Sequence, residues 1–579
     1  CSAALIASDC SIDWLCWPRF DSSALFYRLL DATKGGFFQI VPHGQFSSSQ
    51  HYLDQTNVLA TDLLTDHGSL RVIDLMPIGG GPTRIMRKVE CTDGAFPCRM
   101  VISVTPEFGS EPASVELARG RADFYWRGGT ASLESPFPLL RDDEGCLSAD
   151  FEVRQGDCYW FVLTHSIPAH VRSFSAEGAE ETLSETIAYW RSWADKCSYH
   201  GRYRNAVQRS ALALKLLTYQ PTGAIIAAPT TSLPEWVGAQ RNWDYRYSWI
   251  RDAAWIIEGL MSVGYHDEAM VFWKWLESLD LRSGDPMVVY SLDGAVPGTE
   301  RILDHVEGFR GSRPVRVGNA ARKQRQLDVY GELVRAIFIC SRSMAEMRPL
   351  RPELWSVVRR LIDRVNDTWM KPDRGLWEIR AGEKHYLASK LMCWTALDRA
   401  IQISESDGLE APIAEWRDIR DAIRNRILNE GYNSNLGAFT QSFASPDLDC
   451  SALLIPLVGM LDPKDFRMTS TVAKIRNTLE LDGLLYRYRT EDGLGGPEGA
   501  FTICTFWLVE VLALQGRLEE ADRLFGRMLQ RSSKVGLFSE EIDPESGDLL
   551  GNYPQGLPHL ALIRAAVSLE TSVENRREF

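Results

Sequence analysis

Adjacent Arg251 and Asp252 end a segment whose composition is typical of a sugar-binding site. This segment, residues 241–252 with the sequence RNWDYRYSWIRD, contains three Arg, two Asp, two Tyr and two Trp. A guanidinium group beside a carboxylate offers the donors and acceptors that can bind vicinal hydroxyls. An ion pair that only caps a helix is the other interpretation of an Arg-Asp pair. The flat, partly polar rings around the pair favour the sugar-binding interpretation.

Two glutamates have neighbours that suit them to proton transfer. Glu378 lies between Trp377 and Ile379, and an apolar flank raises the pKa of a carboxyl group towards neutrality, as a general acid requires. Glu540 lies in the sequence FSEEIDP, a polar setting in which we expect it to stay ionised and to serve as a general base. A single Glu in a loop is usually a solvated surface charge. Acid–base chemistry therefore requires that both side chains share one cavity.

The composition limits the partners of the chain. The 579 residues carry a formal net charge of −14, and because an acidic surface repels a phosphate backbone, we expect no nucleic-acid partner. The longest apolar run that we find, residues 450–461 with Pro456 inside it, is far shorter than the roughly 20 residues of a membrane span. We therefore expect no association with a membrane.

The twelve Cys residues are scattered along the chain, which favours a reducing compartment, and we expect a cytoplasmic protein. No HxxH or HExxH spacing occurs, so we expect no metal site. The chain begins at Cys1 without an initiator Met or a basic segment. We expect that it starts inside a longer reading frame, and a removed signal stays open.

Two patterns of hydrophobic residues divide the chain. Up to about residue 165, short alternating apolar runs are broken by Gly, Pro, Asp and Ser, as in residues 69–77 and 84–92. They predict an N-terminal antiparallel β-sandwich over residues 1–175. Residues 176–200 are expected to form a linker helix. The period then becomes helical, which predicts an all-α domain over residues 201–579.

The C-terminal domain is expected to hold twelve helices, paired as six hairpins in an (α/α)6 barrel whose even-numbered helices form a buried inner ring. Their approximate residue ranges are 205–219, 249–264, 267–279, 328–345, 352–370, 388–404, 412–428, 447–459, 467–480, 500–515, 517–530 and 557–569.

Five segments of unusual composition precede or open the second, fourth, sixth, tenth and twelfth of these helices. If even-numbered helices form the inner ring, their N-termini converge at one end of the barrel, and the five segments line a single pit. The segments are RNWDYRYSWIRD, RKQRQLDVYGE, GLWEIRAGEKHYLASK, DGLGGPEGAF and SEEIDPESGDLLGNYPQG.

Five motifs along the chain are informative when they are considered together. They are residues 241–252, the WE of residues 377–378, SEEID at residues 539–543, QGLPHLALI at residues 555–563 and SIDWLCWPRFDS at residues 11–22. The first four closely resemble glycoside hydrolase family 15, the glucoamylase-like inverting enzymes. The last resembles the trehalase-like β-sandwich that precedes the barrel in bacterial-type members of that family. The resemblance covers nearly the whole chain.

The resemblance implies a role for each matching residue. Glu378 matches the family's general acid, and Glu540 matches its general base. Arg251 and Asp252 match the pair that anchors the terminal glucose ring, and Tyr245 matches the ring beside the developing oxocarbenium ion. The resemblance implies these further pit residues: Tyr247, Trp249 and Trp377 as walls, and Gln324 and Glu498 in roles that it leaves open.

The expected reaction is a single displacement in which Glu378 protonates the glycosidic oxygen while Glu540 deprotonates the attacking water. Room for that water predicts a separation of roughly 6.5 to 9.5 Å between the two carboxyl groups. The product would be β-glucose, released one unit at a time from the non-reducing end of a small α-glucoside or oligosaccharide. No metal or organic cofactor is expected.

Several interpretations stay open at this point. Trehalose is the favoured substrate because of the N-terminal resemblance, and a glucoamylase or an isomalto- or maltooligosaccharide glucohydrolase is the alternative. A relative with non-hydrolytic acid–base chemistry, or with sugar binding alone, is an alternative of another class. An all-helical interaction scaffold would leave the shared position of the five segments unexplained. The sequence does not distinguish a monomer from a homo-oligomer.

Overall fold

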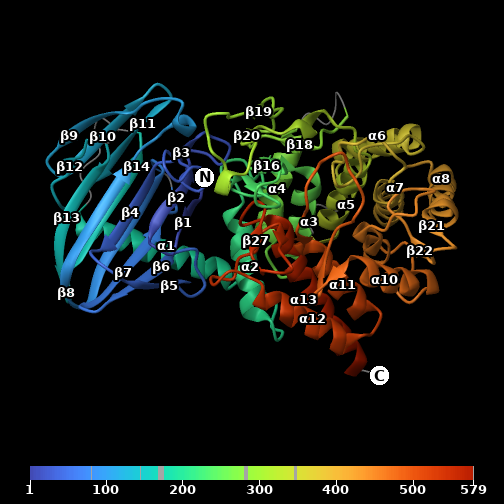
Figure 1. Ribbon diagram of the computed structural model, residues 1–579. Coiled ribbons are helices and arrows are strands. Elements are labelled where there is room, and N and C mark those ends of the chain that lie inside the picture. The colour runs from blue at the N-terminus through green and yellow to red at the C-terminus, as the bar shows by residue number, and fades with distance from the viewer. Residues whose placement is uncertain (80, 144, 167–174, 280–284, 344–348, 578–579) are drawn as a thin grey trace. The chain divides into compact units, whose positions relative to one another are not determined.

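The computed structural model describes residues 1–79, 81–143, 145–166, 175–279, 285–343 and 349–577, and the chain forms two compact units (Figure 1). The N-terminal unit comprises Cys1–Lys196 together with Asp304–Gly311. The C-terminal unit comprises Cys197–Leu303 and Ser312–Phe579.

The strands of the N-terminal unit pair antiparallel throughout the described ladders, which confirms the predicted antiparallel sheet architecture. Short alternating apolar runs form such strands because successive side chains point to opposite faces. The strands are β1 (Ala4–Ile6), β2 (Ser11–Cys16), β3 (Ala24–Phe26), β4 (Phe37–Pro42), β5 (Ser47–Tyr52), β6 (Leu59–Thr65), β7 (Gly68–Leu75), β8 (Arg84–Ser103), β9 (Ser114–Ala118), β10 (Arg121–Trp126), β11 (Gly129–Glu134), β12 (Leu140–Arg141), β13 (Leu147–Arg154) and β14 (Cys158–His165).

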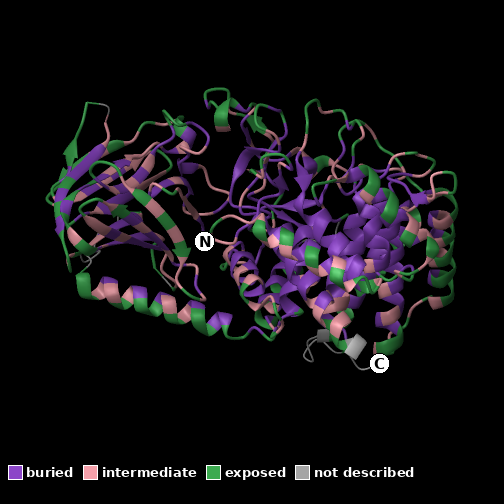
Figure 2. Ribbon diagram, turned by 60° about the horizontal axis from the view of Figure 1, so that its bottom comes forward, coloured by how far each residue is buried: buried purple, intermediate pink, exposed green. Residues whose placement is uncertain are grey.

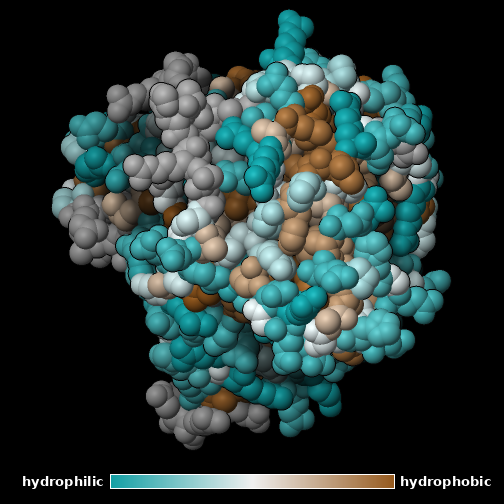
Figure 3. Space-filling model, turned by 90° about the vertical axis from the view of Figure 1, so that its left-hand side faces the viewer, coloured by the Kyte–Doolittle hydropathy of each residue, from teal (hydrophilic) through white to brown (hydrophobic). Residues whose placement is uncertain are grey.

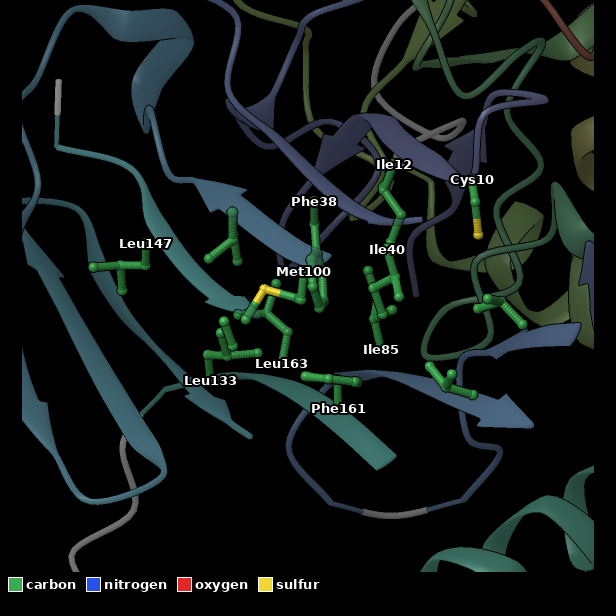
Figure 4. Packing of buried hydrophobic residues seen from close by; sticks show 14 of the residues in the cluster. Cys10, Ile12, Phe38, Ile40, Ile85, Met100, Leu133, Leu147, Phe161 and Leu163 are labelled. Carbon is green, nitrogen blue, oxygen red and sulfur yellow. The ribbon is translucent and has the colours of Figure 1, made fainter. Parts of the chain in front are cut away.

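Strand β8 joins two groups of strands. Its first half pairs with β7 and β14, and its second half pairs with β4 and β13. A cluster of buried apolar side chains draws on both groups: Phe38 and Met100 come from one, Leu133 and Phe161 from the other (Figure 4). Burial of these side chains is the main stabilising contribution to this unit.

A buried ion pair lies inside the same unit. Arg87 is fully buried, and its Nε donates to Oδ1 of Asp74 at 2.7 Å. The guanidinium group also donates to the carbonyl oxygens of Phe38 and Cys10. Because every polar contact of the guanidinium group is internal to the fold, loss of one partner would leave the other charge without compensation.

Helix α1 (Ala176–Ala194) follows the strands and belongs to the N-terminal unit. The Ser175 side chain accepts a hydrogen bond from the Gly178 backbone N–H and so caps the helix start. Leu183, Trp190 and Trp193 are buried along one side, and Figure 2 shows how buried and exposed positions alternate along this helix. Such an amphipathic helix rests its apolar side on the rest of its unit.

The C-terminal unit is helical, as predicted. Its helices are α2 (Arg204–Leu216), α3 (Ile250–Met261), α4 (His266–Ser278), α5 (Asp328–Ser343), α6 (Pro352–Thr368), α7 (Leu387–Asp407), α8 (Ile413–Arg426), α9 (Leu454–Leu457), α10 (Phe466–Leu479), α11 (Thr502–Leu514), α12 (Leu518–Gln530) and α13 (Gly556–Arg577). Short strands lie between them: β15 (Thr231–Pro234), β16 (Asn242–Asp244), β17 (Ser248–Trp249), β18 (Val289–Tyr290), β19 (Arg301–Ile302), β20 (Arg316–Val317), β21 (Tyr432–Asn433), β22 (Ala438–Phe439), β23 (Glu480–Leu481), β24 (Leu484–Leu485), β25 (Ala500–Phe501), β26 (Glu541–Ile542) and β27 (Leu549–Leu550).

Alternate helices contact one another in a closed order. Helix α3 packs on α5, α5 on α7, α11 on α13, and α13 on α3, while the 3₁₀ helix η6 (Cys450–Leu453) lies between α7 and α11. These helices are the most deeply buried part of the unit, as the purple ribbons of Figure 2 show. The helices between them, such as α6 and α12, bury one stripe only.

The eighth expected helix, residues 447–459, is much shorter than predicted. In its place, η6 leads directly into the four-residue helix α9. The Asp449 side chain accepts a hydrogen bond from the Ser451 N–H and starts the turn late. Pro456 lacks an N–H and crowds the carbonyl group four residues earlier, so a continuous helix through this run is disfavoured.

The surface seen in Figure 3 is mostly hydrophilic, with smaller hydrophobic areas between the hydrophilic ones. Large exposed hydrophobic side chains of the N-terminal unit include Leu64, Leu117 and Leu140. Within the described ranges, none of the helices combines the length and the apolar composition needed to cross a bilayer.

Candidate active site

Five chain segments that are distant in sequence line one pocket in the C-terminal unit. Its empty volume is about 960 Å³, including the solvent at its mouth. Each segment comes from the N-terminal end of an inner helix: α3, α5, α7, α11 or α13. They are the five segments of unusual composition in the sequence. The lining includes Trp249, Arg251, Asp252, Gln324, Trp377, Glu378, Asp492, Phe501, Glu540 and Gln555.

Arg251 and Asp252 lie in the first turn of α3 and share a charge-assisted hydrogen bond. Nη2 of Arg251 donates to Oδ2 of Asp252 at 3.1 Å, and Nη1 donates to the carbonyl oxygen of Leu376 at 2.9 Å. Burial raises the pKa of Asp252, and the charge of Arg251 opposes that rise. The guanidinium group is therefore fixed from two sides, with further N–H groups at the pocket surface.

Glu378 is held in a strained backbone conformation in the segment that leads into α7. Its φ of 59° is in the left-handed region, which is unfavourable for a residue with a side chain and persists only where the surrounding structure fixes it. Nε1 of Trp249 donates to Oε1 of Glu378 at 2.7 Å. Since this oxygen accepts, Oε2 is the oxygen on which a proton can be held for transfer. Burial raises the pKa of Glu378, while Arg251 and Trp249 lower it.

Glu540 immediately precedes β26, which pairs with β25 at the start of α11. The hydroxyl group of Tyr245 donates to Oε1 of Glu540 at 2.7 Å. Among the residues that the structure describes, Oε2 is buried and has no hydrogen-bond partner. A buried carboxylate oxygen at a pocket surface needs a partner, and water is the smallest one that fits.

The sequence led us to expect Glu540 in a loop with a polar setting, and the structure buries it instead. Glu540 is 3% exposed and its neighbour Glu541 is fully buried. Burial, followed by the charge of Glu235, raises the pKa of Glu540, whereas Tyr245 and Arg487 lower it. Acidic residues in the sequence SEEID therefore do not form a surface loop, because the strand pair β25–β26 draws them into the interior.

A network of buried charges lies behind Glu540. Arg487 donates to Oε2 of Glu235 at 3.1 Å and to both carboxylate oxygens of Glu498. Arg241 binds Asp492 through two parallel hydrogen bonds of 2.6 and 2.9 Å. Paired in this way, buried ions are compensated and hold the pocket walls in one geometry. Burial raises the pKa of Glu235 to about 7.

The remaining predicted residues divide into two groups. Nε1 of Trp377 donates to Asp449, and Nε2 of Gln324 donates to the Glu378 carbonyl oxygen at 3.2 Å; both Trp377 and Gln324 line the pocket. Tyr247 and Glu498 do not belong to the lining. Tyr247 packs in a cluster with Trp249, and Glu498 is occupied by Arg487 and Arg241.

Several lining residues were missed in the sequence, among them Glu235, Trp243, Arg380 and Arg487. Trp243 lies within residues 241–252, whose composition indicates a sugar-binding site, so its ring could have been predicted to line the pocket. No local signal marks Glu235 or Arg487. In the described part of the chain, no group of three or more His, Cys, Asp or Glu side chains is arranged to hold a metal ion.

A pocket that offers donors and acceptors for hydroxyl groups and holds two carboxyl groups is typical of glycoside hydrolases. The match to Glycosyl hydrolases family 15 extends over residues 201–567, and residues 1–133 match Trehalase-like, N-terminal. The chain belongs to Glycosyl hydrolases family 15.

Relatives named trehalase are similar over nearly the full length. A trehalase of Thermoplasma volcanium is 38% identical over 99% of this chain and 93% of its own, and a trehalase of Mycobacterium tuberculosis is 35% identical over 98% and 87%. A bacterial glucoamylase complexed with acarbose aligns with a TM-score of 0.73 at 14% identity, covering 98% of this chain and 93% of its own. At that identity the structural likeness concerns the fold alone.

Proposed function

We propose that the protein is an inverting, exo-acting α-glucoside hydrolase that cleaves trehalose and releases β-glucose. The observation that carries the proposal is the presence of Glu378 and Glu540 in one pocket, each with one carboxylate oxygen held by an aromatic donor. The second oxygen of Glu540 has no hydrogen-bond partner among the described residues, so it can accept a proton from water. Glu378 serves as the general acid and Glu540 as the general base.

Each of these residues has its own role in a single-displacement hydrolysis. Arg251 and Asp252 bind hydroxyl groups of the terminal glucose and fix the anomeric carbon. Glu378 donates its proton to the glycosidic oxygen, so that the leaving sugar departs as a neutral alcohol. Glu540 accepts a proton from a water that attacks the opposite face of the ring. Tyr245 lies beside the carbon that gains positive charge. Room for this water requires about 6.5 to 9.5 Å between the two carboxyl groups.

Trehalose is the substrate that the relatives favour, because full-length similarity to proteins named trehalase includes the N-terminal unit. The alternative is a glucoamylase or an isomalto- or maltooligosaccharide glucohydrolase. The anchoring pair meets the same terminal glucose in all of these substrates, so the substrate is selected by the part of the pocket that receives the leaving sugar.

The proposal extends to the architecture and location of the protein. We assign residues 1–175 to a trehalase-like β-sandwich, residues 176–200 to a linker helix and residues 201–579 to an (α/α)6 barrel. The closed order of the inner helices supports the barrel, and the two strand groups joined by β8 support the sandwich. The cysteines are all free thiols, which supports the reducing environment of the cytoplasm.

The test is a parallel assay of purified protein with trehalose, maltose, isomaltose and soluble starch, with glucose and its anomer followed by NMR. The proposal expects the fastest hydrolysis with trehalose and initial release of one β-glucose for each bond cleaved. Faster hydrolysis of maltose or starch would favour the glucoamylase alternative. Retention of the α configuration at the attacked carbon would exclude single displacement.

A sugar-binding relative without hydrolysis is the alternative of another class. Glu378→Gln separates the two, since it preserves shape and removes the transferable proton. For a hydrolase, the variant loses glucose release and keeps the rise in Tm that trehalose produces. If the wild-type protein is stabilised by trehalose and releases glucose from none of the four substrates, hydrolysis is not its function.

A further inference from the structure

Arg380 marks the mouth of the pocket. Deep lining residues such as Asp252 and Trp255 are buried, whereas the side chain of Arg380 is 35% exposed and lines the same pocket. It stands two positions after Glu378, the residue that protonates the departing oxygen in the proposed reaction. A side chain at the mouth beside the acid is therefore on the side from which the leaving sugar departs.

The position of Arg380 is fixed by Trp243. Its guanidinium carbon lies 4.3 Å from the centroid of the Trp243 ring, and that of Arg316 lies 4.4 Å from the same ring. Nε1 of Trp243 donates to Oε1 of the buried Glu235 at 2.9 Å, so the indole cannot rotate freely. A ring that already stacks with two cations serves to orient them.

Glu300 holds Arg380 from a second direction. Oε2 of Glu300 accepts from Nη2 of Arg380 at 3.3 Å and from the Ala320 backbone N–H at 3.2 Å. Glu300 also lies 3.6 Å from Nε of the buried Arg316. Within the described residues, Glu300 is the one hydrogen-bond acceptor of the Arg380 guanidinium group. Since a guanidinium group carries five N–H donors, most of them remain for a ligand.

We propose that Arg380 is a specificity-determining residue that donates hydrogen bonds to hydroxyl groups of the leaving sugar, and that Trp243 and Glu300 are the positioning residues that orient it. The ligand class is a hydroxyl-rich hexose in the leaving position. A guanidinium group with fixed orientation binds neighbouring hydroxyl groups at little entropic cost. The inference rests on the proposed hydrolase function and names the residue that selects its leaving group.

A partly exposed ion pair with Glu300 is the competing explanation, and such a pair contributes little to stability. The experiment compares kcat/KM for trehalose with kcat/KM for α-glucosyl fluoride, which has the same glucose and no leaving sugar. Arg380→Met removes the donors and retains much of the stem. The matched control is Arg301→Met, an exposed arginine next to Glu300 that does not line the pocket.

We expect Arg380→Met to lower kcat/KM for trehalose about 10- to 100-fold and to leave that for α-glucosyl fluoride within about twofold. Arg380→Lys should recover part of the loss, because it keeps the charge without the planar fork. Trp243→Phe and Glu300→Gln should each change trehalose hydrolysis in the same selective manner to a smaller extent. Arg301→Met should change neither substrate.

Equal losses with both substrates, or no loss with either, would overturn the role of Arg380 while the hydrolase function stands. Failure of the wild-type protein to hydrolyse either substrate would instead overturn the proposed function. A variant that fails to fold is recognised by its Tm. In that event Arg380→Lys supplies the comparison, and a ratio of kcat/KM values identical to that of the wild type also contradicts the proposal.

Discussion

Tyr245 donates its hydroxyl hydrogen to Oε1 of Glu540 at 2.7 Å, and the second oxygen of that carboxyl group is left for another partner. The hydrogen bond favours the ionised form of Glu540 in a place where burial disfavours it. It also fixes the plane of the carboxylate, so that Oε2 has one direction in which to accept a proton from water. The side chain of Tyr245 thus favours the ionised state of Glu540, the proposed base, and also fixes the direction of its second oxygen.

Replacement of Tyr245 by Phe tests this relationship. The change removes a donor that stabilises the carboxylate, so the pKa of Glu540 rises. Activity requires ionised Glu540 and is lost as the pH falls through that pKa, so the acidic limb of the kcat/KM profile should move to higher pH. The optimum rate should fall about 10- to 100-fold, which corresponds to one hydrogen bond to a charged group.

The control for Tyr245→Phe is Tyr203→Phe. Tyr203 donates a comparable hydrogen bond to Asp522, which is not part of the pocket lining. The control should keep the pH profile of the wild-type protein. An unchanged acidic limb in Tyr245→Phe itself would mean that another group limits activity at low pH.

Glu235 should affect the pKa of Glu540 in the opposite direction to Tyr245. Its negative charge raises the pKa of Glu540, and Glu235→Gln removes that charge while keeping an oxygen for the Trp243 N–H. Glu235 carries this charge above its raised pKa of about 7, and the pKa of Glu540 is itself raised well above its usual value. In Glu235→Gln the pKa of Glu540 should therefore fall, and the acidic limb of kcat/KM should move to lower pH. A pH profile of hydrolysis measures the shift. Movement of the limb to higher pH would contradict the electrostatic role of Glu235.

Substrates with different leaving groups distinguish the general acid from the general base. Fluoride departs with far less need of a proton than a sugar does. Glu378→Gln should therefore lose about 10²- to 10⁴-fold in kcat with trehalose and much less with α-glucosyl fluoride. Glu540→Gln should lose activity with both substrates, because each still requires attack by a deprotonated water. The reverse pattern would exchange the two roles.

Much of the fold could be predicted because its signals are local. The 3.6-residue period identified helices such as α3 and α11, whose N-terminal ends carry unusual residues because they meet at the pocket. The composition of the run at residues 450–461 is equally apolar, yet Pro456, which lies inside α9, has no N–H to donate to the residue four positions earlier, and the chain before α9 forms a 3₁₀ helix. A helix propensity averaged over several residues underestimates the effect of one residue that lacks a backbone N–H.

The electrostatics of the candidate site could not be predicted in the same way. The setting of Glu540 depends on Glu235 and Arg487, which are far from it in sequence, and no spacing rule connects them. Tyr247 illustrates the opposite difficulty. It lies two positions from each of the lining residues Tyr245 and Trp249, so alternation along an extended segment would place all three side chains on one side. Tyr247 instead packs in a buried cluster with Trp249 and does not line the pocket.

The stability of the N-terminal unit should depend strongly on Arg87. Arg87→Met removes the cation and leaves the carboxylate of Asp74, which is also buried, without its partner, and such a loss costs about 3 to 5 kcal/mol. Arg71→Met is the matched control, because its 2.7 Å ion pair with Asp62 is about one-third exposed and should contribute less than about 1 kcal/mol. Urea unfolding followed by tryptophan fluorescence measures both. Because methionine fills much of the same space, Arg87→Met combined with Asp74→Leu should recover most of the lost stability. If the double variant stays unstable, the hydrogen bonds from Arg87 to the carbonyl oxygens of Phe38 and Cys10 contribute more than the ion pair does.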